Sequence, residues 1–438
     1  MARLIDGVAA LLRRAGTERV YGRALGSLDR IEVDDETAAL LADAEGRTLG
    51  GVGVARLTGD VLHLSSQPGG TATPVGVDSL DELAAALAAV AAVEVPTTVA
   101  LHLRFDLDAE LSAQALLDAA ESAPSSPKVA PVLSADLASM RIAMVVGPGA
   151  IRVDPGAVGS TARRGGFGVL NSFGAKGVLR WDSPLHHGTV GLQRDDLDHC
   201  GLDGLDMVLT CGLDPLEVAV GDLRARNRAL LVQDVAPDAT GDLLDHWPRT
   251  HREPAPRPPL YDRIADIVTP HYERDRGAVT GPRAALQLAG AAPDGAVVVA
   301  DAGHAGFVLA RTFPTGVAGS IVVPPVPTEG FALAAAIVCG LAGRPCIGVV
   351  DGGFGLDGDP ESLPNRLAAC AQRLGVAVSL QRWGGGSTDP ADHVERCRAG
   401  FAATHLGVTV DDVGVDLGVL DELVDSLGPI RDGWSTRS

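Results

Sequence analysis

The sequence predicts an α/β protein of three domains, each built on a mostly parallel sheet flanked by helices. Its 438 residues exceed what one hydrophobic core usually serves. Proline-rich stretches at 122–136 and 246–260 indicate linkers, because proline neither continues a helix nor pairs centrally in a sheet. Apolar runs such as Pro345 to Gly355 are typical of buried parallel strands. We therefore expect domains at 1–125, 137–245 and 260–438.

Composition excludes several classes of function. The formal net charge of −20 opposes binding to nucleic acid or to an anionic membrane. Aromatic residues make up 3% of the chain, which disfavours a surface for stacking bases. We find neither a signal-peptide pattern nor an apolar run long enough to cross a bilayer, and expect a cytoplasmic protein. Six cysteines without a CxxC pair suggest neither a zinc site nor a disulfide framework.

The first segment predicts a helix from Leu4 to Ala15, a short strand at 18–22, and an alanine-rich helix at 35–48. Further strands follow within 51–70 and end in a proline-glycine turn. Asp35 and Glu36 open the second helix, where the helix dipole favours acidic side chains.

In the second segment, residues 142–152 predict a strand that runs into a turn, and residues 205–215 predict another strand. That turn is Gly-Pro-Gly, which is too short to indicate a nucleotide-binding loop. His186 and His187 are the titratable candidates here.

The third segment has the clearest candidate site. Residues 296–342 predict a strand, a loop, a second strand, a loop and a helix, and the next strand ends at Asp351. Open α/β sheets bind ligands at the carboxyl ends of their strands. A carboxylate followed by glycines at such an edge can hold a divalent cation against phosphates. The alternative interpretation is a strand followed by an ordinary glycine turn.

Together these segments resemble thiamine diphosphate enzymes of the acetolactate synthase family. VVVADAGHAG, GFALAAAI and VVDGGF follow in the family's order and spacing. The resemblance implies pyrimidine-binding-like (shortened), middle and diphosphate-binding-like domains. It also implies that Asp351 binds magnesium. The cofactor-binding positions that it implies are Gly303, His304, Glu329, Gly330, Asp351, Gly352, Gly353 and Arg382.

The resemblance extends to the first two domains. An ungapped alignment puts Asp35 on the catalytic glutamate, and a shift of one residue puts Glu36 there. One residue turns a helix by about 100°, so both cannot face the cofactor. The alternative is that both acids only stabilise the helix N-terminus. Residues 165–193 resemble the middle domain, which binds FAD or ADP in some relatives. The resemblance places His186 and His187 on a surface loop away from the chemistry.

Three positions depart from the family pattern. Val350 replaces the first glycine of Gly-Asp-Gly, and Glu329 replaces the apolar residue that supports the bent cofactor. Arg382 or Trp383 stands where an asparagine completes the magnesium shell, and neither side chain offers an oxygen. Two hypotheses follow: a divergent thiamine diphosphate enzyme that decarboxylates or ligates small anionic 2-oxo acids, or a non-catalytic homologue or partner subunit without the cofactor.

Two structural expectations complete the sequence analysis. Such α/β domains pair through large apolar faces, so we expect a homodimer or homotetramer. Arginine carries a fixed positive charge in a geometry that matches a carboxylate. We therefore expect Arg382 to form a salt bridge with Asp351 and to occupy the position of the metal.

Overall fold

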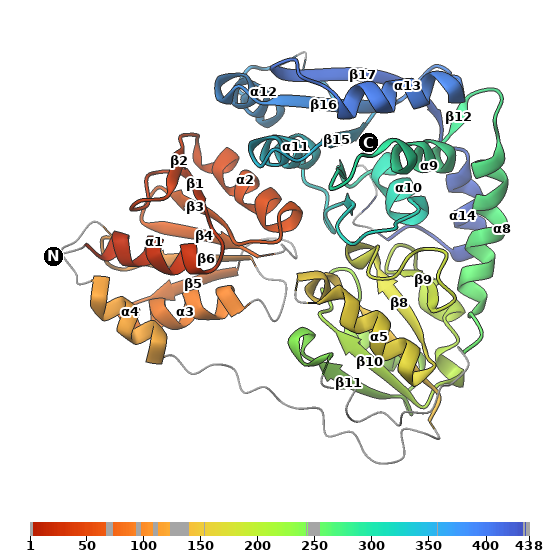
Figure 1. Ribbon diagram of the computed structural model, residues 1–438, viewed down its shortest axis with the longest axis horizontal. Helices are drawn as coiled ribbons and strands as arrows, with labels where there is room; N and C mark the ends of the chain where they lie inside the picture. Colours follow the sequence, from red (N-terminus) through yellow and green to blue (C-terminus); the bar gives the residue numbers. More distant parts are fainter. Residues whose placement is uncertain are drawn as a thin grey trace.

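The computed structural model describes most of the chain in three bodies, coloured red to orange, yellow to green, and green to blue in Figure 1. The described residues are 3–66, 73–92, 98–107, 113–122, 140–152, 154–241, 243, 255–356, 358–431 and 434. Each body contains one sheet.

The first body holds a six-stranded sheet of order β2-β1-β3-β4-β6-β5. Strand β4 runs antiparallel to β3 and β6, and the other pairs are parallel. Helix α2 covers one face, while α1, α3 and α4 lie on the other (Figure 1). The elements are α1 (Leu4–Arg14), β1 (Arg19–Gly22), β2 (Asp29–Ile31), α2 (Asp35–Thr48), β3 (Gly53–Leu57), β4 (Val61–Ser65), β5 (Thr73–Val77), α3 (Leu80–Ala92), β6 (Thr98–Leu103) and α4 (Ala113–Ser122).

The second body holds a parallel sheet of order β11-β10-β7-β8-β9. Strands β8 and β9 follow β7 on one side, and β10 and β11 lie on the other, so the order reverses between β7 and β10. The elements are β7 (Ile142–Val146), η2 (Pro148–Arg152), α5 (Pro155–Gly165), β8 (Gly168–Ser172), η3 (Phe173–Ala175), β9 (His186–Val190), η4 (Asp196–His199), η5 (Leu202–Gly204), β10 (Met207–Cys211), α6 (Val220–Arg226), β11 (Leu231–Val235) and η6 (Pro237–Ala239).

The third body holds a parallel sheet of order β12-β17-β16-β15-β13-β14, which reverses between β13 and β15. Its strands are β12 (Val279–Thr280), β13 (Val297–Ala300), β14 (Ile321–Val322), β15 (Cys346–Asp351), β16 (Ala377–Gly384) and β17 (Gly407–Asp416). Its helices are α8 (Pro259–Glu273), α9 (Gly281–Ala291), α10 (His304–Thr312), α11 (Phe331–Leu341), α12 (Leu363–Leu374), α13 (Pro390–Phe401) and α14 (Val419–Leu427).

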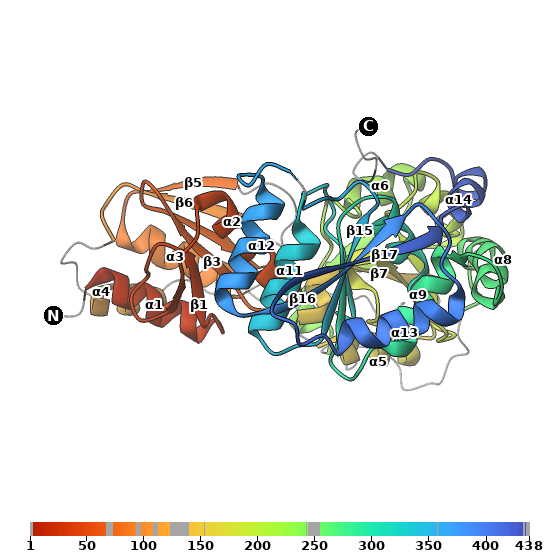
Figure 2. The same cartoon turned by 90° about the horizontal axis from the view of Figure 1, so that it is seen from above.

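Helix α11 joins the first and third bodies. Its sequence is apolar all round, and every residue from Phe331 to Cys339 is buried, as expected for a helix with no solvent face. It packs with α2, α12 and one face of the third sheet in a single apolar cluster, and both views place α2 beside α11 (Figures 1 and 2).

The predicted fold class is confirmed, since three mostly parallel sheets flanked by helices are present. The domain boundaries stay predictions, because the linker stretches at 122–136 and 246–260 lie largely outside the described residues, as do residues 67–70 of the predicted turn. Within the described part of the chain, no helix is long and apolar enough to span a membrane.

Candidate functional site

Asp301 and Asp351 lie at the reversal point of the third sheet. Asp301 follows β13 directly and Asp351 ends β15, and these strands are neighbours. Such a reversal point, at the carboxyl ends of the strands, is where open α/β sheets bind ligands. Local sequence patterning therefore located this edge correctly.

The carboxylate of Asp351 is bound by the N-terminus of α10. One oxygen accepts a hydrogen bond from the backbone N–H of His304 (3.0 Å) and the other accepts one from Ala305 (2.7 Å). Glycine at 303 is required for this approach, because a Cβ there would lie 2.1 Å from a carboxylate oxygen of Asp351. Backbone N–H groups at a helix N-terminus form a natural anion site. In this structure the protein's own carboxylate fills it.

Asp301 is a partly buried acid beside this contact. One of its oxygens accepts a hydrogen bond from the backbone N–H of Ala332 (2.6 Å). Burial raises the pKa of Asp301 to about 7, with the charges of Asp351 and Glu329 acting in the same direction and the Ala332 hydrogen bond opposing them. Near neutral pH the site therefore holds a carboxyl group that readily carries a proton.

The predicted salt bridge between Arg382 and Asp351 is wrong. Arg382 binds Asp412 through two nitrogens, at 2.5 and 2.9 Å, and donates to the carbonyl oxygen of Phe354 at 2.9 Å. The reason is the strand register: Arg382 lies opposite Val350 on one side and Asp412 on the other, whereas Asp351 lies opposite Trp383. Since side chains alternate along a strand, Arg382 and Asp351 are on opposite faces of the sheet.

The other predicted cofactor positions surround this edge without forming a metal site. Gly330 begins α11 with a positive φ of 78°, while Glu329, Gly352 and Gly353 are exposed. Trp383 is buried and donates to the side-chain oxygen of Gln381 (3.1 Å). Among the described residues, no group of three or more His, Cys, Asp or Glu could hold a metal ion. With both Asp351 oxygens on α10, this arrangement does not fit a magnesium–diphosphate group.

Asp35 and Glu36 lie at the N-terminus of α2, where Asp34 caps the helix by accepting from Thr37 (3.0 Å). Asp35 accepts hydrogen bonds from the backbone and hydroxyl of Thr58, and Glu36 pairs with Arg366 of α12. Within the described part of the chain, neither acid has a hydrogen bond or ion pair to Asp301 or Asp351. Asp35 thus contacts the segment after β3, and Glu36 contacts α12 of the third body.

The reversal point of the second sheet is closed by direct backbone contacts. Gly147 donates to the carbonyl oxygen of Cys211 and Gly149 to that of Gly212, both at 2.9 Å. A Cβ on Gly147 would lie 2.3 Å from the Gly212 oxygen. The loops after β7 and β10 therefore touch where a ligand such as FAD or ADP would enter a sheet of this kind.

Sequence reasoning missed a buried acid next to this closure. Glu217 accepts hydrogen bonds from the hydroxyl of Ser172 (2.5 Å) and the backbone of Gly174 (3.0 Å). Burial raises its pKa to about 7, helped by the charge of Asp214 and opposed by Arg47. Arg47 belongs to α2 and lies 4.0 Å from Glu217, so this contact joins the first two bodies. No local motif marks it.

The expected surface-loop position of His186 and His187 is wrong, because both lie on strand β9. His187 is buried, with a ring nitrogen 3.3 Å from the carbonyl oxygen of Ala255. The ring nitrogens of His186 lie 3.2 Å from the Trp181 carbonyl oxygen and 2.8 Å from the Asn171 side-chain oxygen. Burial lowers the pKa values to about 3 for His186 and about 4 for His187.

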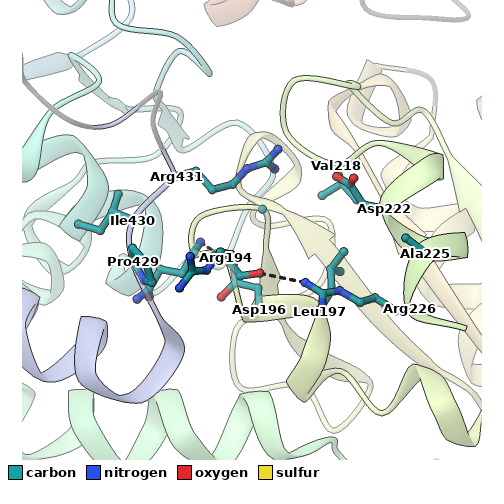
Figure 3. Close-up of a pocket in the computed structure, with 12 residues that line it drawn as sticks. Arg194, Asp196, Leu197, Val218, Asp222, Ala225, Arg226, Pro429, Ile430 and Arg431 are labelled. Atoms are coloured by element: carbon teal, nitrogen blue, oxygen red, sulfur yellow. Dashed lines mark hydrogen bonds between the residues drawn. The ribbon is translucent and has the colours of Figure 1, made fainter.

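A cavity of about 500 Å³ lies between the second body and the C-terminal segment. Figure 3 shows Pro429 to Arg431 on one side and Val218 to Arg226 on the other. Its three arginines already have partners: Arg194 lies 3.5 Å from Asp195, Arg226 lies 2.6 Å from Asp198, and Arg431 donates to the Glu217 carbonyl oxygen. None of the residues predicted from the sequence lines this cavity.

Comparison with solved structures identifies a similar fold. A Mycobacterium smegmatis protein, proposed to be a thiamin diphosphate-dependent enzyme, superposes with a TM-score of 0.61 at 15% sequence identity, covering 95% of this chain and 100% of that chain. No family model and no curated protein matches the sequence. At this identity the likeness shows a common fold over nearly the whole chain, and function has to be argued from the site.

Proposed function

We propose that this protein is a non-catalytic homologue of thiamine diphosphate enzymes, one that keeps their fold but closes the diphosphate position with its own Asp351. The proposal depends on one observation: both Asp351 oxygens accept hydrogen bonds from the N-terminus of α10. A diphosphate needs those N–H groups, and magnesium needs the carboxylate. Both ligands would have to displace a contact that the chain already makes within itself.

Charge also supports the proposal. Asp301, Glu329 and Asp351 are close enough for the last two to raise the pKa of the first, so an incoming diphosphate meets negative charge. The arginine expected to offset it is bound to Asp412 on the other face of the sheet. Like charges that are not neutralised by a metal oppose anion binding. A cofactor would therefore bind weakly or not at all.

A divergent thiamine diphosphate enzyme acting on 2-oxo acids is the second candidate. The observation that favours it is the position of Asp301 and Asp351 on neighbouring strands at the reversal point of a sheet. This candidate requires Asp351 to leave α10 when the cofactor binds. The cofactor would then supply the carbanion-stabilising chemistry, and the chain its position.

Isothermal titration with thiamine diphosphate and Mg²⁺ separates the two candidates. We expect no saturable heat with the unaltered protein and measurable binding of inorganic pyrophosphate to Asp351→Ala, whose α10 amides are free. Asp389→Ala is the matched control, because Asp389 caps α13 through Ala391 (2.8 Å) in the same way. Saturable binding of the cofactor to the unaltered protein would favour the enzyme instead.

A further inference from the structure

A second cavity, of about 80 Å³, lies between the second and third bodies. A water molecule needs roughly 10–15 Å³ on this measure, so the space admits several waters or a small organic molecule. Its wall combines strand β9 and the segment before it with helix α8 and the end of α10. The polar and titratable side chains of this wall include Lys176, His186, Tyr261, Tyr272 and Arg311.

Lys176 is the unusual group in this wall. Its side chain is buried, and its ammonium nitrogen has one hydrogen bond, a long one of 3.4 Å to the carbonyl oxygen of Arg311. No carboxylate pairs with it among the described residues. Burying a cation without a counter-ion costs free energy, so such a group tends to lose its proton or to bind an anion.

The choice of lysine here is specific. Lys128 and Lys176 are the only lysines in the chain, and every other basic residue among the 36 is an arginine. Arginine stays charged at any accessible pH, whereas lysine can release its proton when it is buried. The buried cavity thus carries a lysine, which unlike an arginine can be charged with a ligand and neutral without it.

The rest of the wall lacks negative charge. Arg311 binds Asp196 at 2.7 Å, Thr189 and Gln193, but its Nε has no hydrogen-bond partner within the described part of the chain. Asp196 itself lines the larger cavity of Figure 3. Among the residues that the structure describes, no aspartate or glutamate lines the smaller one.

The other titratable groups in the wall are close to neutral. His186 on β9 has a low pKa because of burial and Lys176. On α8, the Tyr272 hydroxyl donates to the Thr312 carbonyl oxygen, and Tyr261 lies under the Arg257 guanidinium at 3.9 Å. The charge of Arg311 is already paired with Asp196, so the wall offers the positive charge of Lys176 when that amine is protonated.

We propose that this cavity is a binding site for a small carboxylate anion, with the Lys176 ammonium as its counter-ion. The inference is independent of the proposed function, because it concerns different residues between other elements. A carboxylate fits the volume and supplies the acceptor that Lys176 lacks. Aromatic and aliphatic groups of α8 would cover its apolar end.

Proton uptake should accompany binding. Burial lowers the pKa of Lys176 to about 7, and the charge of Arg311 acts in the same direction. An anion favours the charged amine and raises that pKa, so the free site is half neutral near pH 7 while the bound site is charged. If only the charged amine binds, the affinity for acetate should fall about tenfold between pH 6 and pH 8.

Competitive labelling of amines with acetic anhydride tests the ionisation of Lys176 and its response to acetate. Peptide mass spectrometry can resolve the products, because the chain has only two lysines and its N-terminus to label. We expect the reactivity of Lys176 to titrate near pH 7 without ligand, and 20 mM sodium acetate to suppress it and shift its titration upward. Sodium chloride at equal ionic strength and neutral acetamide are controls, with Lys128 as the internal reference.

Isothermal titration of acetate and pyruvate at pH 8, in two buffers with different ionisation enthalpies, gives the proton count. We expect uptake approaching one proton, and loss of binding in Lys176→Met. Circular dichroism and a thermal unfolding scan establish that the variant folds, and Lys176→Arg provides a folded comparison that keeps the charge. Equal Lys176 labelling with acetate and with chloride, or binding without proton uptake, would overturn the proposal.

Discussion

Replacing Asp351 by alanine tests how strongly the chain closes its own strand-end anion site. The change removes two hydrogen bonds to the α10 N-terminus. Loss of a capping side chain costs about 0.5–2 kcal/mol, and loss of a negative charge at a helix N-terminus about 0.3–1 kcal/mol. Removing this charge also lowers the pKa of Asp301, a small gain near pH 7. We expect a net loss of about 1–2 kcal/mol in unfolding free energy.

Urea unfolding followed by tryptophan fluorescence measures this loss, because buried Trp383 lies opposite Asp351 in the strand register. Inorganic pyrophosphate should raise the urea midpoint of Asp351→Ala and leave that of the unaltered protein and Asp389→Ala unchanged. At 100 times its dissociation constant a ligand adds about 2.7 kcal/mol, which would offset the loss. An Asp351→Ala protein as stable as the original, or an original stabilised by pyrophosphate, would refute the reasoning.

Three further predictions follow from buried charge and from assembly. Arg311→Met should lower the free energy of unfolding by about 3–5 kcal/mol in a urea titration, because it leaves buried Asp196 without its ion-pair partner. Adding Asp196→Asn to that variant should recover part of the loss, and equal stability of the single and double variants would contradict the prediction. Asp301 has a raised pKa, so the stability that its protonated form contributes to the fold is present at acid pH and lost as pH rises through about 7. Asp301→Asn should therefore reduce the change in urea midpoint between pH 5 and pH 8, and an unchanged pH dependence would count against this. Light scattering at micromolar concentration should give a dimer or tetramer, and the purified protein should show no flavin absorbance band; a monomer or a yellow protein would reject the respective prediction.

Local sequence patterns predicted the elements well where one segment determines its own structure. The helix at 35–48 begins at the expected acids, since capping and periodicity are properties of neighbouring residues. The strand that ends at Asp351 was predicted in the same way. An apolar run followed by glycines marks both the strand and the sheet edge, whatever the rest of the chain does.

Side-chain partners could not be predicted, because they depend on register between distant segments. The sequence placed Arg382 and Asp351 at the ends of neighbouring strands. Whether their side chains lie on the same face of the sheet depends on the strand register, because a shift of one residue moves a side chain to the other face. In the observed register Arg382 lies opposite Asp412 of the neighbouring strand and forms its salt bridge with that residue. The contact between Arg47 and Glu217 and that between Lys176 and Arg311 likewise join elements from different bodies.

At the strand ends of the second and third sheets, a carboxylate of the chain itself accepts hydrogen bonds from nearby donors. Asp351 takes the N–H groups of α10, and Glu217 takes the hydroxyl of Ser172 and the N–H of Gly174. Each carboxylate sits where an open α/β sheet offers donors to an anionic ligand. A side chain fixed to the backbone loses no translational freedom when it binds, whereas a free diphosphate or nucleotide does. A ligand must therefore displace the carboxylate and also make more favourable contacts than the carboxylate does. At the second sheet, the close approach of the loops after β7 and β10 leaves a nucleotide little surface for such contacts. The smaller cavity differs, because no carboxylate among the described residues pairs with the Lys176 ammonium group, and an external anion would not have to displace one there.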